Sequence, residues 1–270
     1  MRPRGIRTAD RPIGAAKKEH TADPNSVRHS TAKKQALCTS ETWIGRADCR
    51  HCGIRKQVLF SGLSSAELDT ILEPIDMYCY PPESPVYHEG EHNDSVYVAR
   101  TGLVKLVRYL ADGTLRIVRL LGKGDAFGLE RLIGQAYQHT AVAVTQLKLC
   151  RIPIRVLNNL DMKNPAVHRQ LLQRWDEHLR RADDCIAFLS TGTIRRRVAY
   201  LIRLLAEAGG HDSANRVELL GREDMAAMLG VRVESLSRII AELKREGILR
   251  RLDEETYECD AHALQRYADI

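Results

Sequence analysis

The strongest constraint on the fold lies near the end of the chain. Two short amphipathic segments, residues 222–229 and 233–246, are separated by Gly230 and followed by Gly247. Glycine directly after a helix is a common C-terminal cap. The runs ILRRL and TYECD come next and have the composition of two short strands around an acidic turn. A further amphipathic segment, residues 193–207, precedes them. Helix, turn, helix and hairpin predict a winged helix-turn-helix.

The second of these helices has two different faces. Its apolar face is formed by Val233, Leu236, Ile239, Ile240 and Leu243. Glu234, Ser237 and Arg238 share the opposite face at spacings of three and four residues. Arginine can donate two hydrogen bonds to guanine, glutamate can accept one from cytosine, and serine can contact a base. The alternative is an ordinary surface ion pair between Glu234 and Arg238.

Basic residues surround this polar triplet. Arg232, Lys244 and Arg250 are candidate contacts to phosphates, together with the neighbouring Arg245 and Arg251. The net charge of +6 and the pI of about 9.0 also favour an anionic partner. The C-terminal region is therefore predicted to bind double-stranded DNA.

The middle of the chain has the texture of short antiparallel strands. Alternating or β-branched runs occupy residues 84–90, 95–102, 103–110, 115–122 and 140–153. Asp112-Gly113 is a strong hairpin signal between two of these runs. Many short strands with glycine turns predict a small β-barrel or jelly roll. The expected fold class is therefore α+β, with a β-barrel followed by helices.

A heptad pattern follows the strands. Its apolar positions alternate three and four residues apart: Leu172, Trp175, Leu179, Ala182, Ile186 and Leu189. Charged residues flank this seam on both sides. The pattern indicates either a parallel two-helix homodimer interface or one helix packed on its own domain.

These patterns divide the chain into five parts. We expect a disordered basic tail at 1–37, which translation could also bypass by starting downstream. A cysteine-bearing segment at 38–62, a sensory barrel at 63–163, a dimerisation helix at 164–190 and a winged helix-turn-helix at 191–270 follow. No apolar run approaches the roughly 20 residues of a membrane span. The N-terminus has no apolar signal core, which predicts a cytoplasmic protein with no membrane partner.

This order of elements resembles the CRP/FNR family of bacterial transcription regulators from about Cys49 to Tyr267. The segment REDMAAMLGVRVESLSRIIAELKREGIL is similar to the family's DNA-binding signature. Glu234, Ser237 and Arg238 match the E-x-x-S-R spacing of the FNR branch. The stretch GKGDAFG also resembles a turn of the family's barrel. The resemblance implies a homodimer on a palindrome of TTGAT-like half-sites, acting with RNA polymerase.

The resemblance raises the question of the signal. Cyclic-nucleotide members carry a G-E-L cassette followed by R-S/T-A, whose arginine holds the cyclic phosphate. This chain has Gly128-Leu129-Glu130 and then His139-Thr140-Ala141, so the arginine is missing. Arg131 is a conceivable substitute. A phosphate without a charged donor is poorly held, so we expect no cyclic AMP binding.

Cysteine offers another signal. The odd count of seven argues against a disulfide framework. FNR-type oxygen sensors hold a [4Fe-4S] cluster, and the resemblance implies Cys38, Cys49, Cys52 and Cys150 as ligands. The spacing of the N-terminal cysteines departs from the family's pattern, and Cys79 is a second candidate for the fourth ligand.

The sequence is also compatible with other signals and partners. One is a thiol redox switch at Cys49 and Cys52. Another is a haem held by His88, His92 or His139, and a third is an organic ligand in a metal-free barrel. The helices could instead dock on a protein partner, although the polar face of the second helix argues against this. We expect no enzyme, because the chain has no glycine-rich phosphate loop, paired catalytic carboxylates or HExxH motif.

Overall fold

The computed structural model describes residues 38–55, 60–61, 63–68, 74–161, 165–209, 215–253 and 256–269. The described residues fall within one compact unit, Leu37–Ile270. The predicted tail at residues 1–37 lies outside the described residues. Within the described part of the chain, no helix has the length and apolar composition needed to cross a membrane.

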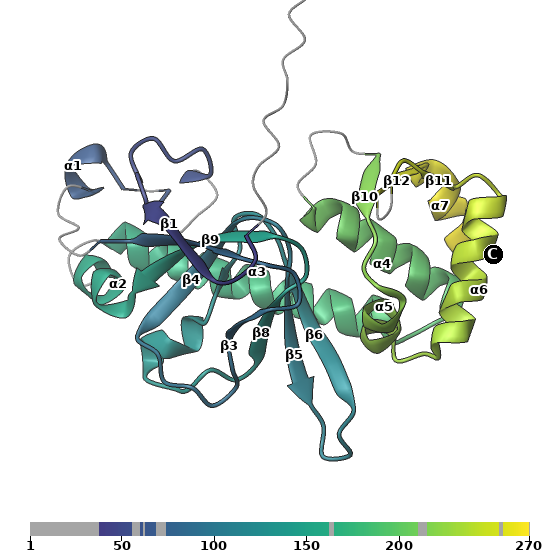
Figure 1. The fold of residues 1–270 in the computed structure, drawn as a ribbon, viewed down its shortest axis with the longest axis horizontal. Coiled ribbons are helices and arrows are strands. Elements are labelled where there is room, and N and C mark those ends of the chain that lie inside the picture. Colours follow the sequence, from purple (N-terminus) through teal and green to yellow (C-terminus); the bar gives the residue numbers. More distant parts are fainter. Residues whose placement is uncertain are drawn as a thin grey trace, which may run out of the picture. The chain divides into compact units, whose positions relative to one another are not determined.

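Antiparallel strands form two sheets in the first half of the described chain (Figure 1). One sheet has the order β1-β2-β9-β4-β7 and the other the order β3-β8-β5-β6. The strands are β1 (Thr42–Arg46), β2 (Asp76–Tyr80), β3 (Pro85–Tyr87), β4 (Ser95–Thr101), β5 (Val104–Tyr109), β6 (Leu115–Leu121), β7 (Ala126–Phe127), β8 (Thr140–Ala143) and β9 (Leu147–Pro153). The short helices α1 (Ser65–Leu68) and η2 (Leu129–Ile133) accompany them. The predicted small barrel of short strands is confirmed.

Sequence patterns located some of these strands better than others. The Asp112-Gly113 hairpin joins β5 to β6, and Gly113 has the positive φ of 79° that its turn requires. The run 140–153 was expected to be one strand and is two. It breaks after Ala143, so that β8 and β9 belong to different sheets. Thr145 lies between the two strands, and its Oγ1 accepts a hydrogen bond from the Leu103 N–H at 3.1 Å.

Two clusters of buried side chains fill the barrel. Alternate residues of a strand point to opposite faces, so neighbouring residues of one strand contribute to different clusters. Tyr87, Tyr97, Phe127 and Tyr137 form an aromatic group in one cluster, with the rings of Tyr87 and Tyr137 stacked at 3.8 Å. The other cluster lies on the face of β4 and β9 that carries Val98 and Cys150.

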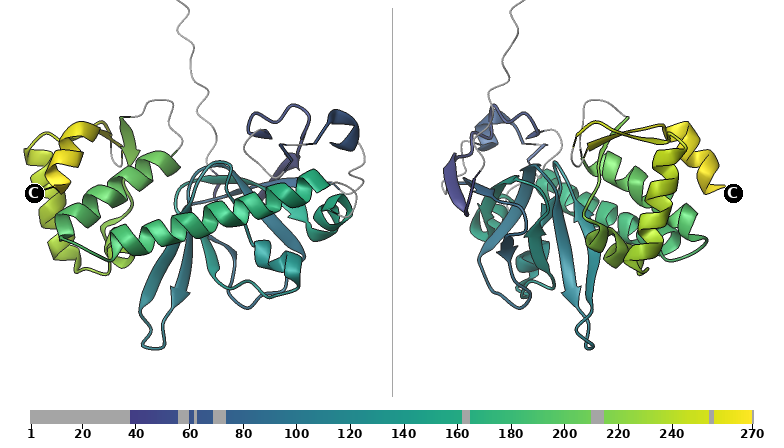
Figure 2. Two further views of the ribbon diagram at one scale, coloured as in Figure 1. Left: turned by 180° about the vertical axis from the view of Figure 1, so that it is seen from behind. Right: turned by 45° about the vertical axis from the view of Figure 1, so that its right-hand side comes forward.

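Helices connect the barrel to the C-terminal domain. After β9 the chain forms α2 (Ile154–Asp161) and the long α3 (Pro165–Leu189). Figure 2 shows α3 running from the barrel toward the C-terminal helices. The expected helix over 164–190 is thus present, and the proline at its first position is compatible with a helix start.

The C-terminal domain contains the predicted helices and hairpin. They are α4 (Ile194–Ala208), α5 (Arg222–Leu229), α6 (Val233–Arg245), β11 (Leu249–Arg251) and β12 (Thr256–Cys259). Thr193 caps α4 through its Oγ1, which accepts from the Arg196 N–H at 3.3 Å. Two elements were not predicted: β10 (Arg216–Glu218), which completes a sheet of order β10-β12-β11, and α7 (Ala261–Ala268).

Candidate functional site

The turn between α5 and α6 sets the direction of the second helix. Gly230 ends α5 with a φ of 60°, and its N–H donates to the carbonyl of Ala226. Leu236 and Leu243 of α6 are fully buried in the domain core together with Met225 of α5. This packing fixes the apolar face of α6 and leaves the opposite face outward.

The outward face carries the predicted triplet. Glu234 and Arg238 are exposed, and Ser237 is half-buried. Within the described residues, no ion pair joins Glu234 to Arg238, so the surface-pair alternative is not formed. Arg238 instead donates through Nη2 to Ser235 Oγ at 3.3 Å. Both charged groups therefore remain available to an external partner.

The predicted phosphate contacts have different environments. Arg232 is exposed in the extended residue that precedes α6. Lys244 donates to Tyr257 Oη at 2.8 Å and lies 4.5 Å from the centre of that ring. In the wing, Arg250 pairs with Glu258 at 3.2 Å. Lys244 and Arg250 are exposed but already have partners within the domain.

The long helix leaves most of its seam uncovered. The exposed fractions are 51% for Leu172, 62% for Leu179 and 68% for Ile186. Trp175 is also exposed, whereas Leu189 is buried in the core of the C-terminal domain. The seam was expected to include Leu189, but this residue anchors the end of α3 to the C-terminal domain. Ala182, near the middle, is half-buried.

Comparison with known proteins agrees with this architecture. The model of the cyclic nucleotide-binding domain matches residues 79–164, and that of the Crp-like helix-turn-helix domain matches residues 196–267. The transcriptional regulator LdrP of Thermus thermophilus is 32% identical over 188 residues, which cover 68% of this chain and 92% of that protein. The chain belongs to the CRP/FNR family of transcription regulators. Its helix-turn-helix is therefore a DNA-binding element, and the chain is a regulator rather than an enzyme.

Two further CRP/FNR relatives span nearly the same region. The cyclic AMP receptor protein of Thermus thermophilus is 30% identical over 194 residues, covering 71% of this chain and 88% of that protein. The crystal structure of a CRP-family transcriptional regulator from the same organism is 30% identical with a TM-score of 0.60. The match covers 71% of this chain and 96% of the chain in that structure.

Three cysteines gather beside the barrel. Cys49, Cys52 and Cys150 line one small cavity of about 20 Å³ together with Arg100. Arg100 lies where the register of β4 and β9 shifts, on the strand face of Val98. Its Nη1 lies 3.5 Å from Cys52 Sγ and 3.6 Å from Cys150 Sγ. Arg100 has no sequence signal, because a strand position does not reveal a neighbour 50 residues away.

Burial dominates the chemistry of these thiols. It raises the pKa of Cys49 to about 11, with smaller contributions from Cys150 and Cys52. Burial also raises the pKa of Cys150, against the hydrogen bond from Arg100. Cys52 and Cys49 are partly accessible, whereas Cys150 is buried.

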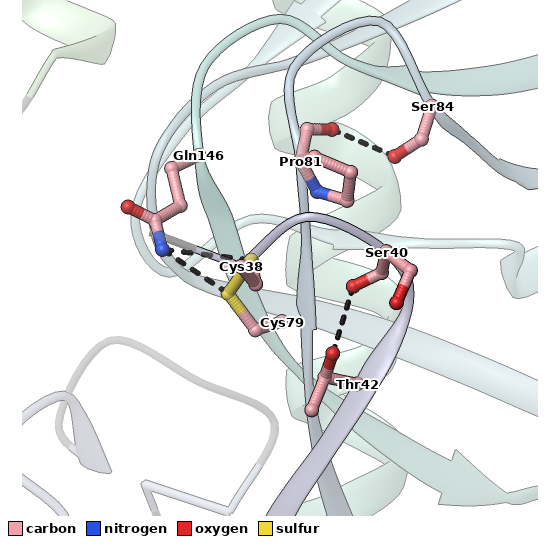
Figure 3. Close-up of a disulfide and its surroundings, with 7 residues drawn as sticks. All are labelled: Cys38, Ser40, Thr42, Cys79, Pro81, Ser84 and Gln146. Atoms are coloured by element: carbon pink, nitrogen blue, oxygen red, sulfur yellow. Dashed lines mark hydrogen bonds between the residues drawn. A yellow bond between two sulfur atoms is a disulfide. The ribbon is translucent and has the colours of Figure 1, made fainter. Parts of the chain in front are cut away.

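The expected fourth cysteine is elsewhere. Cys38 forms a disulfide with Cys79, with their Cα atoms 6.2 Å apart (Figure 3). This departs from the expected grouping of Cys38 with Cys49, Cys52 and Cys150, and from the expectation of no disulfide. The reason is the register of β1 and β2, which places Thr42 opposite Cys79 and so brings the residues before β1 to that end of β2.

The described residues do not fit a [4Fe-4S] centre with four cysteine ligands. Within that part of the chain, no group of three or more His, Cys, Asp or Glu side chains is arranged to hold a metal ion. The guanidinium of Arg100 lies between two of the three sulfurs, and the cavity has room for about one water molecule.

A larger cavity of about 420 Å³ lies between the barrel and α3. Its lining includes Glu130, His139, Arg119 and the seam residue Trp175. Arg131, the conceivable phosphate donor, is not in this lining. Its side chain is buried and donates to the backbone carbonyls of Asn93 and Gln135 and to Asp94.

His178 of α3 also lines this cavity, and sequence patterns gave no sign of it. It is 6% exposed, and its Nε2 has no hydrogen-bond partner among the residues that the structure describes. Burial, and then the charge of Arg119, lower its pKa. His178 is therefore a neutral, unsatisfied polar group beside the cavity.

Proposed function

We propose that this CRP/FNR regulator binds DNA as a homodimer and reads an inverted repeat of TTGAT-like half-sites. The observation that carries the proposal is the outward face of α6, where Glu234, Ser237 and Arg238 are grouped without an internal ion pair. Each protomer inserts the N-terminal part of α6 into a major groove. Arg238 then donates to guanine O6 and N7, Glu234 accepts from cytosine N4, and Ser237 contacts a neighbouring base.

The homodimer is supported by the apolar stripe on α3. Leu172, Leu179 and Ile186 are more than half exposed on one helix face. Soluble proteins usually cover such a stripe, and a second α3 in parallel register would cover it by knobs-into-holes packing. No acid occupies a seam position, so we expect the dimer to persist without a signal. Size-exclusion chromatography of the untreated protein tests this, and a monomer would contradict it.

The regulator is further proposed to respond to oxygen or redox state through its thiols. Cys49, Cys52 and Cys150 share a cavity with the Arg100 guanidinium, which favours the thiolate at Cys49 and Cys150, although burial outweighs this effect at both. Oxidation of these thiols would alter the packing beneath β1. The bound dimer is expected to act on RNA polymerase.

A second signal has its own support. The cavity with Arg119, His139 and His178 has the size and the polar groups of a small-molecule site. Because the chain is similar to a cyclic AMP receptor protein, cyclic AMP is one compound to examine in this cavity. Arg131 would not hold its phosphate, because its side chain donates to Asn93, Gln135 and Asp94 instead. A ligand-dependent regulator without a metal centre is therefore the alternative to redox control.

The experiment that tests DNA recognition compares Arg238→Met with wild type on the TTGAT inverted repeat. We expect a loss of about 1–3 kcal/mol in binding free energy, confined to duplexes that keep the contacted guanine. The control is Arg108→Met, which removes an exposed positive charge on β5. Equal losses for both variants on every sequence would leave only charge attraction and would contradict base recognition.

A further inference from the structure

The Cys38–Cys79 disulfide joins a partly accessible cysteine to a buried one. Cys79 is 2% exposed at the end region of β2, whereas Cys38 is half-buried just before β1. Gln146, from the turn between β8 and β9, directs its side-chain amide at the bond. Its Nε2 lies 3.5 Å from Cys38 Sγ and 3.4 Å from Cys79 Sγ (Figure 3). An attacking thiolate can therefore reach Cys38 more easily than Cys79.

The disulfide fastens an edge strand. β1 has a single neighbour, β2, in its sheet, and its side chains are mostly exposed. Besides the backbone ladder with β2, contacts of β1 and its flanking residues hold it: Trp43 Nε1 donates to Asp76 Oδ1 at 3.0 Å, Tyr80 Oη donates to Glu41 Oε1 at 2.8 Å, and the Ala47 N–H donates to the Ile75 carbonyl at 2.7 Å. Edge strands with few buried side chains are prone to local opening.

β1 leads directly into the residues that cover Cys150. Ala47, Cys49 and Cys52 pack on the barrel cluster that contains Cys150. Cys150 lies in β9, a central strand of the sheet, where it is opposite Met77 of β2 and Val98 of β4. The residues that shield this thiol are therefore held from one side by β1 and its disulfide.

We propose that Cys38–Cys79 is a thiol–disulfide exchange site whose reduction by a dithiol loosens β1 and exposes the Cys150 thiol. A thiolate of the dithiol attacks Cys38 Sγ, and the Cys38–Cys79 bond breaks. Cys79 leaves as a thiolate that accepts from Gln146 Nε2 and is then protonated. The second thiol of the dithiol attacks the mixed disulfide, which frees Cys38 and oxidises the dithiol to its disulfide.

This inference rests on the proposed redox control and adds the element that governs it. Loss of the disulfide removes one attachment of an edge strand that pairs with β2 in the barrel sheet. The expected change is therefore local. Cys259, 6% exposed in the core of the C-terminal domain, serves as an internal reference within the same molecule.

The experiment uses the full chain, purified in air and then treated with dithiothreitol. Peptide mapping without reductant should show residues 38 and 79 in one linked species. A short pulse of iodoacetamide, read by mass spectrometry, should then label Cys150 about tenfold faster after reduction, with Cys259 unchanged. The absence of the linked species, an unchanged Cys150 rate, or an equal rise at Cys259 would overturn the proposal.

Two variants sharpen the result. Cys38→Ser should give fast Cys150 labelling without any reductant, and Gln146→Met should slow the reduction severalfold because the leaving thiolate loses its donor. If Cys38→Ser does not fold, the reduced wild-type protein still provides the comparison. A Gln146→Met rate equal to that of wild type would overturn the assigned role of the amide.

DNA binding separates this proposal from the one it rests on. Wild type and Cys38→Ser are titrated with the TTGAT repeat under oxidising and reducing conditions. A redox effect on affinity that disappears in Cys38→Ser supports the exchange site. A redox effect of equal size in both proteins overturns the exchange site and leaves redox control standing. If the affinity of wild type does not change with redox conditions, redox control itself is contradicted. The peptide mapping and the labelling rate of Cys150 then still test the exchange site separately.

Discussion

Lys105 of the barrel strand β5 forms an ion pair with Asp224 of α5, with Nζ 2.7 Å from Oδ2. The same ammonium lies 2.8 Å from Glu83 Oε2, and the Lys105 side chain is 7% exposed. Burial lowers the pKa of Lys105, but the hydrogen bonds to Asp224 and Glu83 outweigh it and raise the pKa overall. This lysine therefore links the barrel to the first helix of the helix-turn-helix.

Replacing Lys105 should weaken that link. Lys105→Met leaves Asp224, which is only 19% exposed, without its cation, so we expect unfolding to become easier by about 1–3 kcal/mol. Arg108→Met on the same strand breaks an exposed pair with Glu89 and should cost less than about 1 kcal/mol. Urea unfolding of both variants makes the comparison, and equal costs would contradict a buried link.

The uncovered seam of α3 predicts the effect of a charge placed on it. Ile186→Glu should convert the dimer to a monomer, because two buried carboxylates would face each other in the parallel pair. The affinity for the two-half-site duplex should fall with it. Val118→Glu changes an exposed apolar residue of β6 and is the matched control. Sedimentation equilibrium distinguishes the two, and a dimeric Ile186→Glu would rule out this interface.

The disulfide should contribute to stability as well as to redox behaviour. It joins residues 41 apart in the sequence, a loop length for which chain entropy predicts about 3–4 kcal/mol. Cys38→Ser should lower the free energy of unfolding of the barrel by up to this amount, measured with urea in air. Cys185→Ser removes a free, half-buried thiol of α3 and should have a smaller effect. Equal stability of wild type and Cys38→Ser in air would contradict a stabilising role of the disulfide.

His178 predicts a dependence of stability on pH. Its pKa is lowered in the folded protein, so the unfolded chain binds its proton more readily. The resulting stability is complete above about pH 6.5 and is lost as the pH falls from there toward the lower folded pKa. The Tm of wild type should therefore fall more between about pH 8 and pH 5.5 than that of His178→Gln. Parallel pH profiles for the two proteins would contradict a neutral buried imidazole.

The sequence predicted those features that depend on local pattern. The Asp112-Gly113 turn, the three–four spacing on α3 and the glycine after α5 each reflect the geometry of neighbouring residues. The outward position of Glu234 and Arg238 followed from the same periodicity. These features located the helix-turn-helix and the barrel.

Contacts between distant residues were beyond such reasoning. The pairing of Cys38 with Cys79 depends on the register of β1 and β2, and the position of Arg100 between two sulfurs depends on β4 and β9. The burial of Leu189 results from packing against another domain, which a heptad pattern does not reveal. The interruption between β8 and β9 was missed because residues 140–153 are apolar on both sides of it.

The most direct test of the central claim is a fluorescence anisotropy titration at one fixed salt concentration. Wild-type protein is added to a labelled duplex with two inverted TTGAT half-sites, and separately to the same duplex with both half-sites scrambled. The account predicts binding at least about 10³-fold tighter to the first duplex, saturating at two chains per duplex. Equal affinity for the two duplexes, or saturation at one chain, would contradict a homodimer that reads this palindrome.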